Sequence, residues 1–328
     1  MDDSDGRAIT PGSKPGGGTM AGRPPRPRSA AERARVIRQR RRRAGALVAV
    51  GVAALLLGMV LGAAARSSAR HGDAAAARRR ASRQSTSLPT HPVPKPSLSS
   101  READAIDRTM RTTPIVRMAG SQHRQIALTF DDGPGPYTPA ILQILARTHT
   151  PATFFEVGEE LRYFAASTAE IVRLGDPIGD HTWSHPDMSR LSGRRQQRQL
   201  LREAAAIGDE GAPFPRMYRP PFGMWNGTTL RLLRQNHMLM VLWSVDTDDW
   251  ETPGTKQIIR SVLSGARAGA IILMHDAGGD RSETVAALPV IIRDLRRRGY
   301  RLVTVPRLLL DNPAPRQQDV ASVKGQGG

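Results

Sequence analysis

Two adjacent carboxylates, Asp131 and Asp132, stand at the end of a short apolar run, in the segment Thr-Phe-Asp-Asp-Gly-Pro at 129–134. The apolar residues at 126–130 predict a strand, and a Gly-Pro turn follows the acids at once. Unpaired charge is costly to remove from water, so a strand that ends in two acids must have a use for them. Metal binding or catalytic proton transfer would be such a use.

Two histidines, His181 and His185, lie four residues apart in the segment His-Thr-Trp-Ser-His. On a helix their side chains would share one face about 6 Å apart, which suits two ligands of one ion. With a carboxylate from Asp132 the set becomes two His and one Asp, and catalytic zinc commonly has three protein ligands and an open position for water. Thr182 occupies the place where the zincin motif needs its glutamate, so this is not that motif.

The elements that must position these residues begin near residue 101, where short apolar runs alternate with helical patterns. Strands are predicted at 125–130, 152–157, 177–179, 217–219, 238–245, 270–274 and 301–305, and helices at 139–147, 167–174, 194–207, 227–235, 256–267 and 283–298. This alternation predicts an α/β fold with a parallel sheet, an irregular (β/α)7-type barrel whose chemistry lies at the C-terminal ends of the strands.

Polar clusters occur at those strand ends, each after a different strand. Asp131 and Asp132 follow one strand, and the others are followed by His181, by Arg219, by the acids at 246–249, and by His275 with Asp276. We expect this convergence to form one site.

Five segments carry a resemblance to a known family. They read TFDDGP at 129–134, HTWSH at 181–185, RPPFG at 219–223, DTDDW at 246–250 and ILMHD at 272–276. In these segments and in their order the chain resembles the carbohydrate esterase family 4 polysaccharide deacetylases, also called NodB-homology domains, over roughly residues 120–310. The resemblance implies a metal-dependent hydrolase that removes acetyl groups from a polysaccharide.

The resemblance also implies residue roles that agree with their chemistry. Asp132, His181 and His185 would hold a divalent metal, zinc first, with Co²⁺ and Mn²⁺ as alternatives. Asp131 would be the general base that takes a proton from the attacking water, and Arg219 would hold Asp131 through a charge-assisted pair.

The other implied roles concern the leaving group and the acetyl group. His275 would be the general acid, kept protonated by Asp249. The backbone N–H of Phe222 would help to stabilise the tetrahedral intermediate, although many relatives have Tyr at that position. Trp250 and Leu273 would form the pocket for the acetyl methyl, with an ordinary core position as the rival interpretation of both.

The charge of the chain is unevenly distributed. The formal net charge is +18, but residues 1–100 contain 19 Lys and Arg against 5 Asp and Glu, whereas residues 101–328 contain 29 against 25. Because the basic excess belongs to the N-terminal part, we expect no nucleic-acid binding by the folded domain. The chain has no cysteine, which excludes disulfides, thiolate metal sites and a lipoprotein anchor.

The N-terminal part predicts a membrane anchor. Residues 1–43 are predicted to be a disordered basic cytoplasmic tail, and residues 44–65 are 22 residues without a charge. At ~1.5 Å per residue this run reaches across a bilayer core of about 30 Å. Nine arginines in the 18 residues before the run, against six in the 18 after it, favour a cytoplasmic N-terminus. A cleaved signal peptide is the alternative, because three alanines at 63–65 resemble a cleavage site.

The remaining boundaries follow from composition. Residues 66–118 are predicted to be a flexible stalk and lead-in segment, residues 119–310 the catalytic domain, and residues 311–328 a disordered tail. We therefore expect a single-pass membrane protein, monomeric, with its catalytic domain outside the cytoplasm.

We expect the substrate to be the N-acetylglucosamine of peptidoglycan, with chitooligosaccharides and acetylated xylan as the alternatives. Two other protein classes share part of this residue set. Non-haem Fe(II) oxygenases also use two His and one carboxylate, but they need neither Asp131 as a base nor Arg219 to hold it. A catalytically silent glycan-binding domain would need neither Asp131 nor His275.

Overall fold

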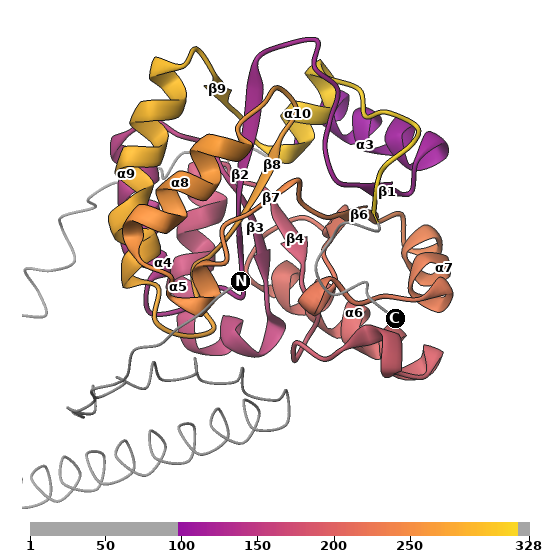
Figure 1. Cartoon of the computed structure of the whole chain (residues 1–328). Coiled ribbons are helices and arrows are strands. Elements are labelled where there is room, and N and C mark those ends of the chain that lie inside the picture. Colours follow the sequence, from indigo (N-terminus) through magenta and orange to yellow (C-terminus); the bar gives the residue numbers. More distant parts are fainter. Residues whose placement is uncertain (1–97, 321–328) are drawn as a thin grey trace, which may run out of the picture. The chain divides into compact units, whose positions relative to one another are not determined.

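The computed structural model describes residues 98–320, which form one parallel sheet surrounded by helices (Figure 1). The strands are β1 Ile115–Val116, β2 Gln125–Asp131, β3 Thr153–Glu156, β4 Ile178–Asp180, β5 Met217–Tyr218, β6 Leu239–Val241, β7 Val245–Asp246, β8 Ile271–His275 and β9 Arg301–Leu302. The helices are α3 Ser100–Thr112, α4 Thr138–Arg147, α5 Gly158–Leu174, α6 Gly193–Asp209, α7 Gly227–Gln235, α8 Thr255–Gly265, α9 Ser282–Arg297 and α10 Val305–Asp311.

The sheet is an open path and not a closed barrel. Its strand order is β1-β6-β5-β4-β3-β2-β8-β7, with β9 beside β2, and every strand pair is parallel. Within residues 98–320 no pairing joins β1 to β7, so the prediction of a barrel is corrected to a curled, incomplete one. The strand predicted at 238–245 is interrupted between β6 and β7, which lie at different places in the sheet.

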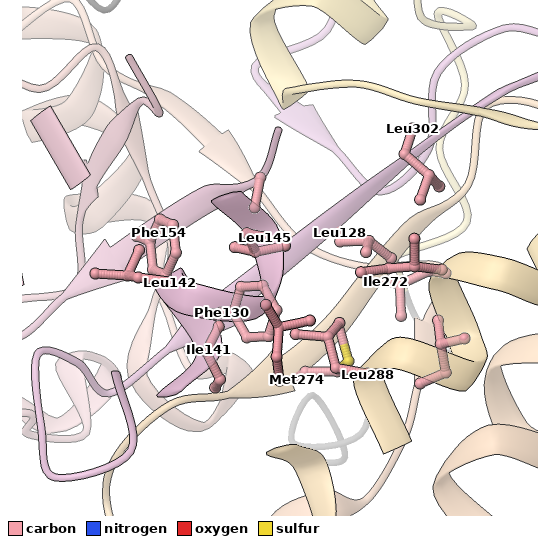
Figure 2. Packing of buried hydrophobic residues seen from close by; sticks show 14 of the residues in the cluster. Leu128, Phe130, Ile141, Leu142, Leu145, Phe154, Ile272, Met274, Leu288 and Leu302 are labelled. Carbon is pink, nitrogen blue, oxygen red and sulfur yellow. The ribbon is translucent and has the colours of Figure 1, made fainter. Parts of the chain in front are cut away.

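The outer face of the sheet carries the larger apolar layer. Alternate residues of β2 and β8, among them Leu128, Phe130, Ile272 and Met274, are buried in one cluster with apolar residues of α4 and α9 (Figure 2). Successive side chains of a strand point to opposite faces, so the residues between them must face inward. Thr129, Asp131 and His275 are therefore on the inner face, together with Ala127 and Ile271 of a second cluster.

The N-terminal end of the inner face is covered by α3 and α10, which lie side by side (Figure 1). Their buried residues Ile106, Leu308 and Leu309 join the inner cluster. The sequence predicts residues 66–118 as a flexible stalk and lead-in, but the part of this range from 98 onward belongs to the domain. The cause is the amphipathic pattern of α3, whose start is capped by Ser99 and Glu102 in a capping box.

Residues 311–320 also contact the domain, although the sequence predicts a disordered tail there. The side chain of Asn312 is buried, and the Gln318 side chain accepts hydrogen bonds from the backbone N–H groups of Arg117 and Met118 at 3.0 and 3.2 Å. Among residues 98–320 no helix is both long and apolar enough to cross a membrane. The span predicted at 44–65 and the tail at 1–43 lie outside the described residues.

We predict that α3 stabilises the domain. Replacing Ile106, which is fully buried, with Ala should lower the free energy of unfolding by about 2–5 kcal/mol, because it leaves a cavity in the inner cluster. The matched control Arg108→Ala, on the exposed side of the same helix, should change it by less than about 0.5 kcal/mol. Equal small effects of both changes in urea denaturation would contradict a structural role for α3.

Candidate active site

The site is centred on a buried ion pair between Asp131 at the end of β2 and Arg219 just after β5. Oδ1 of Asp131 accepts a hydrogen bond of 2.6 Å from Nη1 of Arg219. The arginine is completely buried. The same nitrogen donates to the hydroxyl of Thr129 at 2.8 Å, while Nε and Nη2 donate to the carbonyls of Val241 and Leu242. The guanidinium is thus held by β2 and by the end of β6, and Asp131 is fixed by it.

The guanidinium also lies over aromatic rings. Its central carbon is 4.1 Å from the centre of the Phe155 ring and 5.7 Å from that of Trp243. Gly179 provides the space for Phe155, because a Cβ there would meet a ring carbon at 2.5 Å. Small and aromatic residues of the inner face therefore determine where this charge lies.

Asp132, His181 and His185 come together beside this pair, as the sequence predicts. Oδ1 of Asp132 lies 3.1 Å from Nε2 of His185 and 3.5 Å from Nε2 of His181. One ligand atom from each of the three residues lies within 4.8 Å of the other two. This is the spacing of atoms that can share one metal ion.

The residues fit a divalent metal. Oδ1 of Asp132 is buried and accepts no hydrogen bond within the described part of the chain, although two imidazole nitrogens face it. The other ring nitrogen of His181, Nδ1, lies 2.7 Å from the carbonyl of Arg219, so an Nδ1–H donated there leaves Nε2 with a free lone pair. Burial raises the pKa of Asp132, but the two imidazoles outweigh it and hold that pKa well below its ordinary value. The ligand set is therefore one carboxylate and two nitrogen donors.

The two histidines lie on a loop and not on a helix, which corrects the predicted geometry. Thr182 and His185 have φ of 72° and 53°, so the segment turns back on itself. His185 donates its backbone N–H to the Thr182 hydroxyl at 3.1 Å, which closes the turn. The ring centres of His181 and His185 are still only 4.9 Å apart. Asp132, with φ of 71°, is likewise presented by a left-handed residue at the strand end.

His275, at the end of β8, is paired with Asp249. Its Nδ1 lies 2.6 Å from Oδ1 of Asp249, and its backbone N–H donates to Oδ2 at 2.8 Å. Burial lowers the pKa of His275, but the charge of Asp249, with smaller contributions from Asp132 and Asp131, raises it to about 9. His275 is therefore positively charged at neutral pH, and it can donate a proton from Nε2.

The three residues predicted to contact substrate differ in their environment. Phe222 has φ of 61°, is 59% exposed, and places its ring edge-on to His185 at 4.5 Å between centres. Trp250 is 48% exposed, which rules out the core interpretation for it. Leu273 is 4% exposed and packs in a cluster with Tyr218 and Met240, so the core interpretation holds for most of its surface.

Several supporting residues are not evident from the motifs. The Thr284 hydroxyl donates to Oδ2 of Asp249 at 2.7 Å, and Nη1 of Arg281 donates to the Asp249 carbonyl. Glu203 of α6 accepts the backbone N–H of His181 at 3.0 Å. Glu203 could have been recognised, because it falls on the apolar side of α6 at helical spacing from Leu200. The contacts of Thr284 and Arg281 depend on tertiary packing and have no local signal.

Asp276, whose role the sequence left open, lies beneath the loop that follows β2. Its backbone N–H donates to the carbonyl of Asp131, and its Oδ2 accepts from the Thr138 hydroxyl at 2.5 Å. That hydroxyl in turn accepts the backbone N–H of Gly135 at 2.7 Å. Asp276 therefore supports the loop from inside.

Comparisons with known proteins agree with this fold and site. Residues 119–241 match the family model described as polysaccharide deacetylase. The chain is 37% identical over 187 residues to a peptidoglycan-N-acetylglucosamine deacetylase from Bacillus cereus, covering 56% of this chain and 87% of the relative. It is also 37% identical over 202 residues to a chitooligosaccharide deacetylase from Bradyrhizobium, covering 56% of this chain and 90% of the relative.

A solved structure has the same fold. The crystal structure of the Bc1960 peptidoglycan N-acetylglucosamine deacetylase superposes with a TM-score of 0.59 at 30% identity, covering 64% of this chain and 97% of that one. The fold and site define a hydrolase domain built on a curled parallel sheet, with its polar residues at the strand ends. The chain belongs to the polysaccharide deacetylase family, carbohydrate esterase family 4. It is a polysaccharide deacetylase that acts on carbon–nitrogen bonds other than peptide bonds.

We predict that Asp132 is essential for metal affinity. Asp132→Asn removes the anionic ligand while keeping a residue that tolerates the left-handed backbone, so zinc affinity should fall by about 100-fold or more. Competition with a chromophoric chelator measures the loss. Asp248→Asn, also at a left-handed position, is the matched control and should bind zinc as the parent does. Equal affinity in both variants would exclude Asp132 as a ligand.

Proposed function

We propose that this chain is a metal-dependent hydrolase that removes N-acetyl groups from N-acetylglucosamine in peptidoglycan. The observation that carries the proposal is the grouping of Asp132, His181 and His185 beside the Asp131–Arg219 pair at the strand ends. The Bacillus cereus relative supports peptidoglycan, and the Bradyrhizobium relative supports chitooligosaccharide as the second candidate. Acetylxylan remains a third substrate for the experiment below.

The proposed cofactor is Zn²⁺, held by Asp132, His181 and His185. Zinc supplies Lewis-acid chemistry at such a site, polarising the acetyl carbonyl and making the attacking water more acidic. Asp131 takes the proton of that water, and the hydrogen bond from the Arg219 guanidinium holds its carboxylate in position. The other carboxylate oxygen of Asp131, Oδ2, lies 3.8 Å from Nε2 of His181 and accepts the proton next to the proposed metal ligands.

Proton donation is assigned to His275. Once water has attacked, the amine can leave only if its nitrogen gains a proton, and the His275 imidazolium supplies it. Asp249 orients the ring through Nδ1, which leaves Nε2 as the donor. The backbone N–H of Phe222 stabilises the charge that develops on the carbonyl oxygen, and the exposed ring of Trp250 forms a wall for the acetyl methyl.

The proposed location is outside the cytoplasm, where peptidoglycan is found. Residues 44–65 would anchor the chain in the cell membrane as a single span with a cytoplasmic N-terminus, or would be removed as a signal peptide. We propose a monomer, since one chain supplies every residue assigned to the reaction.

Acetate release tests the function directly. The zinc-loaded full chain should release acetate from peptidoglycan and from N-acetylglucosamine oligomers, and less from acetylxylan. Asp131→Asn and His275→Ala should each lower kcat at least about 100-fold, because each removes one proton-transfer group, while bound zinc stays near one ion per chain. Normal turnover in either variant would reject its role. Glycan binding without any acetate release by the parent would indicate the silent glycan-binding alternative.

The pH profile tests the His275–Asp249 pair. Since the reaction needs protonated His275, the rate should fall as pH rises through about 9, where this imidazole loses its proton. Asp249→Asn removes the negative charge that raises the pKa, so the alkaline limb should move to lower pH. The dependence of kcat/KM on pH, which reports the pKa of the free enzyme, measures both. An alkaline limb at the same pH in both enzymes would assign it to another group.

A further inference from the structure

The exposed side of α6 carries a row of arginines. Arg195, Arg198 and Arg202 are spaced by three and four residues, which places them on one side of the helix, and all three are exposed. From Gly193 to Ala205 the only acid is Glu203, and it is buried beneath His181. Within residues 98–320 no salt bridge joins any of the three arginines to a carboxylate.

This row is unlike several other surface arginines of the domain. Arg173, Arg190 and Arg307 each pair with an acid three or four residues away on the same segment. The sequence of α6 supplies no such partner at those spacings on its exposed side. The charge of the row is therefore not neutralised by any carboxylate among residues 98–320.

The row is joined to the metal-ligand loop by direct contacts. The guanidinium carbon of Arg202 lies 3.7 Å from the centre of the Trp183 ring, and that of Arg162 from α5 lies 4.7 Å from the same centre. Gln199, between the arginines on α6, exchanges two hydrogen bonds of 2.9 Å with Ser184. Trp183 and Ser184 lie in the loop between His181 and His185, so the Arg202 end of the row adjoins that loop, and Arg198 and Arg195 continue it along α6.

We propose that Arg162, Arg195, Arg198 and Arg202 form a docking surface for the acidic groups of the substrate strand, and we call it the arginine surface. This inference rests on the proposed function and sharpens its substrate class. Peptidoglycan carries free carboxylates on the peptides of its muramic acid residues, whereas chitin and acetylxylan backbones are neutral. A strand with one N-acetylglucosamine in the site extends past the loop, where exposed guanidinium groups can pair with those carboxylates.

A membrane surface is the competing partner, since anionic lipids also attract arginines. The position of the arginine surface favours the glycan. Because it adjoins the loop that carries His185, a bilayer held against it would lie where the substrate strand has to pass. A glycan strand can contact the arginine surface and the reaction site at the same time.

The test compares an anionic and a neutral substrate of similar length, using the zinc-loaded full chain. The substrates are a peptide-bearing muropeptide tetrasaccharide and the tetramer of N-acetylglucosamine. In the double variant Arg195→Gln, Arg198→Gln, the ratio of kcat/KM for the muropeptide to that for the tetramer should fall about fivefold, because two exposed charge contacts are lost. Amidating the carboxylates of the muropeptide should lower the ratio similarly in the parent and should abolish the difference between the two enzymes.

The matched control is Arg260→Gln, Arg297→Gln. These exposed arginines belong to α8 and α9, which pack beside β7 and β9 and away from α6 (Figure 1). The control should keep the parent ratio. An unchanged ratio in the α6 variant, or an equal fall in the control, overturns the proposal. So does a loss of binding to phosphatidylglycerol vesicles in the α6 variant with no change in the substrate ratio.

Binding separates this proposal from the proposed function. In zinc-loaded His275→Ala, where turnover is suppressed, calorimetry should show weaker muropeptide binding after the two α6 substitutions and a weaker effect of those substitutions at high salt. If the parent releases no acetate from any glycan but this binding difference is found, the arginine surface stands and the deacetylase assignment falls. If acetate is released and the binding difference is absent, the reverse holds.

Discussion

The buried ion pair between Arg219 and Asp131 is the constraint on which the site depends. A guanidinium completely removed from water is tolerated only when its donors are satisfied, and here one carboxylate, one hydroxyl and two backbone carbonyls accept from it. These acceptors come from β2 and from the chain at the end of β6. The hydrogen bonds of the Arg219 guanidinium therefore fix the separation of these two parts of the sheet and the orientation of the Asp131 carboxylate, the proposed base.

The loops after the strands turn the chain so that the site residues meet, which straight strands cannot do. Asp132, Thr182 and His185 all have positive φ, a costly conformation for residues other than glycine. In each case the left-handed residue turns the chain sharply, so that groups from two strand ends face one point. Asp276 beneath the first loop and Glu203 beneath the second hold these turns with hydrogen bonds. Hydrogen bonds within the protein thus hold the candidate metal-binding residues in place.

Local patterns in the sequence predicted much of the fold and of the candidate site. The alternation of strands and helices predicted the parallel sheet, and the polar residues that follow the predicted strands placed Asp131 and His275 at the strand ends. The predicted irregular barrel is present only as a curled, incomplete one, because closure depends on whether the edge strands find partners. The strand predicted at 238–245 was one apolar run, yet the chain leaves the sheet within it and returns beside β8.

The sequence by itself determined the family, the strand-end positions of the proposed acid and base, and the residues able to bind a metal, because residue type and short-range spacing carry that information. Tertiary structure alone decided that His181 and His185 meet through a turned loop, that α3 covers the inner face, and that Trp183 joins the arginines of α5 and α6. Those features arise from contacts between residues far apart in the chain. No local pattern encodes such contacts, since they are set by how the helices pack on a curled sheet.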